Sequence, residues 1–287
     1  MPDDLLEPTE QIKQIGLSAG ATVVGVADAE AFNEYVPAGH RPADILPGAR
    51  SVVVAGSLGP TKGAWRSPNH RVAEVTGYDF RENVAVHVVA DAIEQQFGYY
   101  AIQAPGLPTA GQTPPMSMML AAVLAGLGTR SLAANIILHP KYGLLYYGAC
   151  LTTMPLAYDH QLGKNVCPAP SCVQAYRRLG KTPCMAVCPE DNGGCIGGEL
   201  DEDGRIVHSH FNRDRCSTRA MNFGIKGHVK MLEIAINEDD PQQRAAIIYS
   251  DEFRRHLSAI GRYKESVAQC FECMRVCPVG RADRRLQ

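Results

Sequence analysis

The sequence has little net charge and no long apolar run, and each absence excludes a class of protein. It carries 28 Lys and Arg against 30 Asp and Glu, a net charge of −2, which leaves no basic surface for nucleic acid or an anionic membrane. No apolar run is long enough to span a bilayer. The first residues, MPDDLLEPTEQ, are acidic and polar, unlike a signal peptide. We therefore expect a cytoplasmic protein with no nucleic-acid or membrane partner.

Cysteine is absent before Cys150, although the chain contains ten cysteines and nine of them lie from Cys167 onward. Without an export signal, these cysteines are not expected to form disulfides. The uneven distribution predicts two parts, a cysteine-free α/β part followed by a compact metal-binding part.

Acidic residues are absent between Glu94 and Asp159, where Arg130 and Lys141 are the only permanently charged residues. Two interpretations stay open. The stretch is either a well-packed core segment or the wall of a pocket for a large, mostly apolar ligand.

The apolar pattern indicates an α/β (α+β) fold. Short β-branched runs bounded by glycine predict buried strands at 21–28 and 51–57, and a strand pair is expected at 136–139 and 142–156. A first helix is predicted with Thr9 as its N-cap and Ile12, Ile15 and Ala19 on one face. A second covers 82–98, ends at Gly98 and places Val84, Val88, Ala92 and Ile93 on one face. A third covers 117–128, and a Pro/Gly loop at 104–115 is long enough to border a site.

Two cysteine runs share the ending C-x3-C-P. The first contains Cys167, Cys172, Cys184 and Cys188, and the second contains Cys270, Cys273 and Cys277. In two-cluster ferredoxins the cysteine before proline binds the cluster of the other run. The pattern therefore predicts two 4Fe–4S clusters with crossed ligands. The first cluster is assigned to Cys167, Cys172, Cys184 and Cys277, and the second to Cys188, Cys216, Cys270 and Cys273.

Cys216 completes the second set because it lies between the two runs, beside Arg213 and Arg215. Cys195 is the alternative for that place, and Cys150 and Cys195 are otherwise interpreted as ordinary residues. Structural zinc is the competing interpretation, although zinc sites prefer pairs of C-x2-4-C. The first run departs from the usual C-x2-C-x2-C spacing, so the exact ligand roles of its first two cysteines stay open.

Beyond the cysteines, the chain resembles the cobalamin-dependent iron–sulfur reductases, which include epoxyqueuosine reductase and the reductive dehalogenases. The matching pieces are GATVVGVAD, ILPGARSVVVAGS, AGLG, NIILHPKYGLLYYGACLTTMPL and the cysteine order ending in CFECMRVCPVG. The resemblance implies a nitroreductase-like domain at 1–163 that binds base-off cobalamin. A ferredoxin-like domain with two 4Fe–4S clusters would follow at 164–287, with a helical insertion at about 217–268. The implied cobalamin contacts are Gly126, Gly128, Asn135, His139, Tyr142, Gly143, Gly148 and Thr152.

The resemblance also implies electron transfer through the clusters to cobalt, from an external low-potential donor such as ferredoxin or flavodoxin, in a possible homodimer. The substrate is expected to be a small organic molecule. The family uses an acidic residue or a tyrosine as proton donor. The candidates here are Tyr146, Tyr147, Tyr100 and Lys141.

This sequence departs from the epoxyqueuosine reductases because their catalytic aspartate, upstream of AGLG, has no counterpart in AGQTPPMSMMLAAVLAGLG. A general acid must lie within hydrogen-bond reach of its target. We therefore expect no reduction of epoxyqueuosine in tRNA. The alternative function is a non-catalytic, ferredoxin-like electron-transfer or corrinoid-activating protein.

Overall fold

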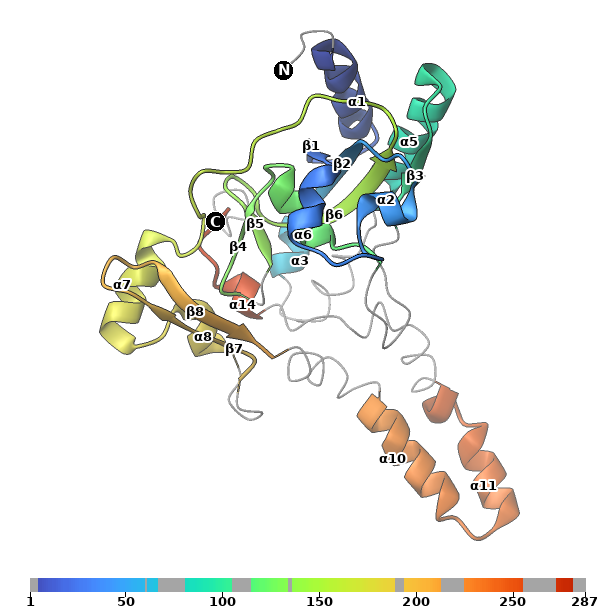
Figure 1. Cartoon of the computed structure of the whole chain (residues 1–287). Coiled ribbons are helices and arrows are strands. Elements are labelled where there is room, and N and C mark those ends of the chain that lie inside the picture. The colour runs from blue at the N-terminus through green and yellow to red at the C-terminus, as the bar shows by residue number, and fades with distance from the viewer. Residues whose placement is uncertain are drawn as a thin grey trace.

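The computed structural model describes residues 5–59, 61–66, 81–104, 115–133, 136–188, 194–212, 225–254 and 272–280. Figure 1 shows an α/β body built from the first half of the chain and a cysteine-bearing part beside one end of its sheet. A pair of helices projects away from both. No helix in these ranges is long and apolar enough to cross a membrane.

The body contains a six-stranded sheet in which every described pairing is antiparallel. Its strands are β1 (Val23–Asp28), β2 (Ser51–Leu58), β3 (Ala101–Gln103), β4 (Thr129–Arg130), β5 (Ile137–His139) and β6 (Gly143–Thr152). The order is β1-β2-β6-β5-β4, and β3 also pairs with β6. The strands predicted at 21–28, 51–57, 136–139 and 142–156 are therefore confirmed. The central strand β6 is the longest, and it carries five of the predicted site residues, namely Gly143, Tyr146, Tyr147, Gly148 and Thr152.

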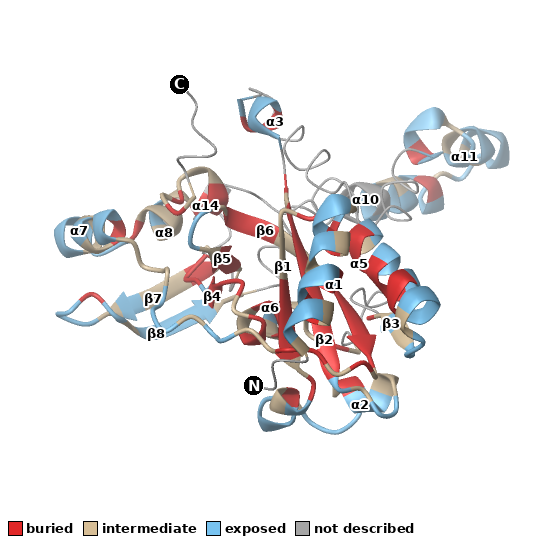
Figure 2. Ribbon diagram, turned by 90° about the horizontal axis from the view of Figure 1, so that it is seen from above, coloured by how far each residue is buried: buried red, intermediate tan, exposed pale blue. Residues whose placement is uncertain are grey.

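Helices cover both faces of the sheet, as Figure 2 shows. On one face, α1 (Leu6–Ser18) and α5 (Arg81–Ala92) pack over Val53, Ala55 and Cys150. On the other face, α6 (Met118–Leu124) packs over alternate residues of β2 and β6. Because successive strand residues point to opposite faces, β6 contributes to both cores. Four short helical segments complete the body, namely the 3-10 helix η2 (Glu30–Glu34), α2 (Pro42–Ile45), α3 (Lys62–Arg66) and the π-helical turn η3 (Ile93–Phe97).

Two details of the predicted helices are wrong. Thr9 is not an N-cap, because α1 begins before it and its hydroxyl donates to the Leu5 carbonyl inside the helix. Val84 and Val88 are 54% and 39% exposed, whereas Ala85 and Val89 are fully buried. The buried face of α5 is instead formed by Ala85, Val86, Val89 and Ala90, which pack on the sheet in one core. Gly98, with φ of +72°, ends the helical segment as predicted.

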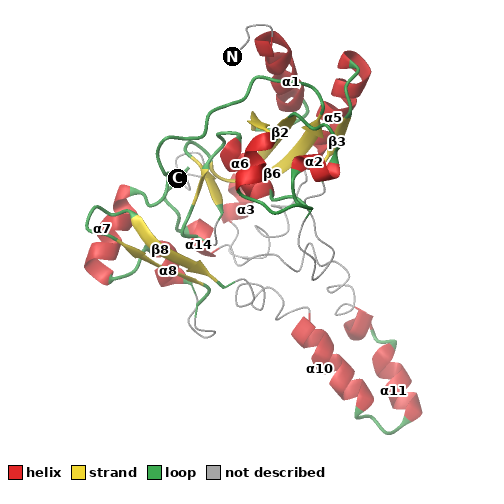
Figure 3. Cartoon of the chain, viewed as in Figure 1, coloured by secondary structure: helices red, strands yellow, loops and turns green. Residues whose placement is uncertain are grey.

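The cysteine-bearing part consists of short helices and one hairpin, shown in Figure 3. Its elements are α7 (Pro170–Leu179), α8 (Pro183–Val187), β7 (Ile196–Leu200), β8 (Ile206–Phe211) and α14 (Glu272–Arg275). Strands β7 and β8 pair only with each other in the described residues. Helices α8 and α14, which are distant in sequence, pack side by side.

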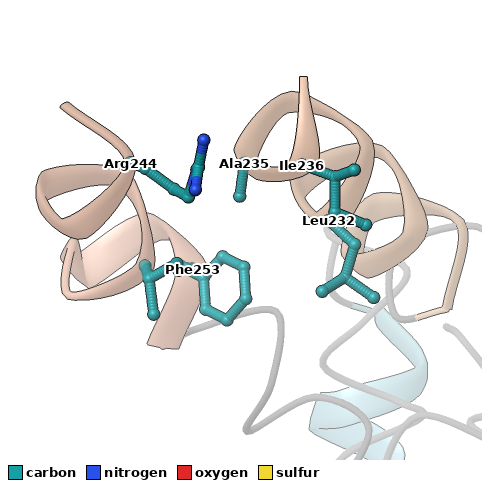
Figure 4. A pocket seen from close by; sticks show the side chains of 6 residues that line it. Leu232, Ala235, Ile236, Arg244 and Phe253 are labelled. Atoms are coloured by element: carbon teal, nitrogen blue, oxygen red, sulfur yellow. The ribbon is translucent and has the colours of Figure 1, made fainter. Parts of the chain in front are cut away.

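The helical insertion contains α10 (Ile225–Ile236) and α11 (Pro241–Ile248), which form a hairpin. Between them lies a pocket of about 340 Å³, lined by Leu232, Ala235, Ile236, Arg244, Ile248 and Phe253. Figure 4 shows these side chains facing one another across the hairpin. The pocket is built from the insertion alone and includes none of the predicted site residues.

Candidate functional site

Proline fixes the starts of the helices that carry the first cysteine run. Pro170 and Pro183 occupy the first turns of α7 and α8, where the missing N–H is not needed. Cys172 and Cys184 follow them in the first turn of each helix, and Cys188 comes directly after α8. The C-x3-C-P spacing therefore places two thiols at opposite ends of one short helix.

Six of the eight described cysteines gather in or against one apolar cluster, which we call the cysteine-lined core. It consists of Trp65, Ala133, Leu138, Leu144, Cys188, Ile196, Cys273, Met274, Cys277 and Val279. Cys167, Cys184 and Cys195 pack against it and are partly buried. Because Leu138 and Leu144 belong to β5 and β6, this core joins the cysteine-bearing part to the sheet.

Cys277 lies among the cysteines of the first run, as the crossed pairing predicts. Burial, together with the neighbouring thiols of Cys184, Cys277 and Cys172, raises the pKa of Cys167 to about 12. Burial also raises the pKa of Cys172, with Cys184 and Cys277 as its next contributors. These four sulfurs are thus close enough for their charges to interact. Their role as ligands stays a prediction.

The second predicted set is only partly described, because Cys216 and Cys270 lie outside the described residues. Cys188 and Cys273 are both buried in the cysteine-lined core. Among the described side chains, no three His, Cys, Asp or Glu converge as a single metal ion requires.

The two cysteines interpreted as ordinary residues differ in position. Cys150 is fully buried in β6, and burial raises the pKa of its thiol to about 12. Cys195 instead lies against Cys188, with the two Sγ atoms 3.2 Å apart. The sequence offered no signal for this contact beyond the glycines that precede Cys195.

Two contacts fix the second cysteine segment to the body. The Arg275 guanidinium donates to the Trp65 carbonyl at 3.0 Å and lies 5.7 Å from the centre of its ring. Gly280 has φ of +68°, and a Cβ on it would lie 2.3 Å from the Gly143 nitrogen. The backbone after Cys277 therefore packs directly on the first residue of β6.

His139, Lys141, Tyr142 and Gly143 form the tight turn between β5 and β6. The Nδ1 atom of His139 accepts hydrogen bonds from the backbone N–H groups of Lys141 at 3.1 Å and Tyr142 at 3.2 Å. The His139 and Tyr142 rings contact each other, and the Lys141 ammonium lies 5.0 Å from the centre of the Tyr142 ring. Burial, and then the charge of Lys141, lower the pKa of His139.

We expect acid to destabilise this turn through His139. Its lowered pKa means that the folded state prefers the neutral ring. The stability contributed by the two hydrogen bonds to Nδ1 is therefore complete above the unfolded pKa of about 6.5. It is lost as the pH falls through the lower folded pKa, because a proton on Nδ1 removes both hydrogen bonds. NMR titration should give a His139 pKa below about 6.5, and His139→Ala should flatten the pH dependence of urea unfolding in that window. A His139 pKa at or above the unfolded value would contradict this.

The predicted proton donors occupy different surroundings. Tyr146 packs against the cysteine-lined core, and Tyr147 packs on the other face of the sheet beside α6. The Tyr147 hydroxyl is buried without a hydrogen-bond partner in the described residues, and burial raises its pKa. Tyr100 is 74% exposed near the far end of β6, and Lys141 is exposed in the turn. The structure therefore brings Tyr146, and not Tyr100, to the cysteines.

Sequence analysis missed a carboxyl group that folding brings to the acid-free stretch. Glu82, at the start of α5, is only 7% exposed. Its carboxylate accepts hydrogen bonds from the Ser57 hydroxyl at 2.6 Å and from the Asn83 amide at 2.9 Å. Ser57 is the cross-strand partner of Tyr146, so these side chains share one face of the sheet. The stretch from 95 to 158 lacks acids in sequence, but an acid lies beside it in space.

Several predicted cobalamin contacts have structural roles in this fold. A Cβ at Gly126 would lie 2.3 Å from the His160 carbonyl oxygen, and one at Gly128 would lie 2.7 Å from that of Leu138. Gly148 similarly lies against the backbone of Glu82. Thr152 is fully buried and donates to the Tyr100 carbonyl. Asn135 lies outside the described residues, and the cobalamin contacts all stay predictions.

Comparison with known proteins identifies the fold. No family model and no curated protein sequence matches the chain. Among solved structures, an epoxyqueuosine reductase bound to an epoxyqueuosine-modified tRNA-Tyr stem loop is 16% identical, with a TM-score of 0.53. The match covers 96% of this chain and 66% of that one. The epoxyqueuosine reductase of Bacillus subtilis is 14% identical over the same shares, with a TM-score of 0.50. A reductive dehalogenase whose structure suggests a mechanism for B12-dependent dehalogenation is 17% identical, with a TM-score of 0.53.

The chain shares the fold of these reductases. It spans just under two thirds of the epoxyqueuosine reductase chains and 39% of the dehalogenase chain. At this level of identity, the likeness concerns the fold alone. The predicted resemblance to this group is confirmed at that level, and the structural neighbours are reductases.

Proposed function

We propose that the chain is a cobalamin-dependent iron–sulfur reductase that acts on a small organic substrate. The observation that carries the proposal is the convergence of both C-x3-C-P segments on the start of β6. There Leu144 contributes to the cysteine-lined core and Tyr146 packs against it. The segment from His139 to Gly143, assigned to cobalamin by sequence resemblance, adjoins the same place through Gly280.

The donor set suits iron–sulfur clusters, because thiolates are the ligands that hold them. Cys167, Cys172, Cys184 and Cys277 would hold the first cluster, and Cys188, Cys216, Cys270 and Cys273 the second. Cobalamin, when bound, would supply the low-valent cobalt that reduces the substrate. The buried Tyr147 hydroxyl without a partner in the described residues is a group that a polar substituent of the macrocycle would satisfy.

The chain's own residues would exclude water and hold protons. The apolar residues of the cysteine-lined core keep solvent from the thiols. Tyr146 is the proposed proton donor, because of the candidates it alone packs against that core. Glu82 accepts a hydrogen bond from Ser57, the cross-strand partner of Tyr146. We assign Glu82 as a positioning residue that holds Ser57 beside Tyr146, and not as a group that contacts the substrate. An external ferredoxin or flavodoxin is the proposed electron donor.

Anaerobic reconstitution tests this proposal. Protein prepared with iron and sulfide should contain two 4Fe–4S clusters, and added aquocobalamin should convert to the base-off spectrum and remain bound after gel filtration. Zinc in place of iron would overturn the cluster assignment. If the protein assembles the clusters but retains no cobalamin after gel filtration, the alternative function of an electron carrier is favoured. Restored queuosine in the tRNA of a strain lacking epoxyqueuosine reductase would overturn the assignment of a small-molecule substrate.

A further inference from the structure

Cys195 is not one of the eight predicted cluster ligands, but its thiol is in contact with one of them, Cys188. It immediately precedes β7, and its Sγ atom lies 3.2 Å from that of Cys188. Its backbone N–H also donates to the Cys188 sulfur at 3.0 Å. The two sulfurs are therefore held together by the chain at the edge of the cysteine-lined core.

The two thiols differ in access to solvent. Cys188 is 6% exposed, whereas Cys195 is partly exposed. The preceding Gly194 has φ of +68°, and a Cβ there would lie 3.9 Å from the Cys188 sulfur, so the chain turns closely over Cys188 at this point. An incoming reagent would reach Cys195 first, and Cys188 would be the nearest thiol to react next.

The proposed clusters do not require Cys195, because eight other cysteines supply their ligands. In compartments where thiols are kept reduced, the disulfides that form are mostly transient, catalytic or redox-sensing. A disulfide needs the sulfurs to approach from 3.2 Å to about 2.05 Å, a small movement for two side chains already in contact.

We propose that Cys188 and Cys195 form a reversible disulfide in the cluster-free protein, and that this bond withholds Cys188 from the second cluster. The effect on the cluster rests on the proposed function, whereas the disulfide itself does not. The oxidant is a low-molecular-weight disulfide, RSSR. The Cys195 thiolate attacks it to give a mixed disulfide and RS⁻. The Cys188 thiolate then attacks the Cys195 sulfur and releases a second RS⁻, so two thiolates are oxidised and one RSSR is reduced.

The disulfide is tested on the full-length, cluster-free chain with oxidised glutathione. Peptide mapping under non-reducing conditions should link the peptides that contain Cys188 and Cys195, and about two free thiols per chain should be lost. Cys195→Ser should prevent this linkage. The matched control is Cys150→Ala, which removes a thiol buried in β6 and should leave the linkage intact. Absence of the linked peptides from the wild-type protein would overturn the proposal.

The effect on the second cluster is read as iron content after reconstitution. Oxidised wild-type protein should take up about half the iron of the reduced protein, and a dithiol should restore it. Cys195→Ser should take up full iron whether or not it was exposed to oxidised glutathione. Loss of iron from reduced Cys195→Ser would instead make Cys195 a ligand and overturn the proposal. Linked peptides in a chain that never binds iron would support the disulfide and refute the proposed function.

Discussion

Replacing Cys277 by serine should remove about half of the iron and sulfide from the reconstituted protein. Cys277 is 8% exposed and interacts electrostatically with Cys167 and Cys172, more than a hundred positions earlier in the chain. If the ligands cross, this one substitution disrupts the first cluster although it lies in the second run. Iron, sulfide and electron paramagnetic resonance measurements on the anaerobic protein report the result.

Two further variants make this test specific. Cys184→Ser should lose the same resonance signal as Cys277→Ser, because the crossed assignment gives both side chains to the first cluster. Cys150→Ala should retain both signals, since that thiol lies inside the sheet. If Cys277→Ser and Cys273→Ser lose one signal while Cys184→Ser loses the other, the ligands do not cross and the pairing is wrong.

Replacing Gly280 by alanine should detach the second cysteine segment from β6. A non-glycine residue at φ of +68° costs about 1–2 kcal/mol, and the new Cβ would lie 2.3 Å from the Gly143 nitrogen. Overpacking against backbone adds about 1–3 kcal/mol, because neither chain segment can move without breaking other contacts. We expect a lower midpoint of urea unfolding together with poor retention of the first cluster.

Gly180 provides a matched control for this substitution. It also has φ of +68°, but a Cβ there would meet nothing within 4 Å. Gly180→Ala therefore carries only the backbone cost of about 1–2 kcal/mol. The difference in the free energy of unfolding between the two variants measures the cost of placing a Cβ at position 280 against the Gly143 backbone. Equal losses of stability would show that Gly280 does not hold the segment against β6.

Local patterns predicted β1 and β2 well because both are short β-branched runs bounded by glycine, whereas β3 and β4, of three and two residues, are too short to give a pattern. They failed on the face of α5, where the larger residues Val84 and Val88 are exposed and the small residue Ala85 is buried. Gly148 lies against the Glu82 backbone and the Val86 side chain, a contact between α5 and β6 that helical periodicity alone does not report. Propensity thus located the elements, and tertiary packing decided their orientation.

The site was predictable only where one short segment carries the chemistry. The C-x3-C-P runs identified the cysteines, but the contacts that complete the site join residues far apart in sequence. Ser57 with Glu82 and Cys188 with Cys195 belong to separate elements whose meeting no local pattern encodes. Glu82 lies outside the acid-free stretch in sequence and reaches it only through folding, so no pattern within 95–158 reports it.

The bond between Arg275 and the Trp65 carbonyl joins positions 210 residues apart, and this separation sets an order of events during synthesis. The ribosome produces the chain from the N-terminus, so β2, β6 and the first cysteine run emerge well before Cys277. A growing chain therefore presents Cys167, Cys172 and Cys184 without Cys277, their proposed fourth partner, until residue 280 is free to dock on Gly143. Iron supplied earlier would meet an incomplete set of thiols. If the proposed first cluster forms, its loading is thus expected after translation, once residue 280 can reach β6.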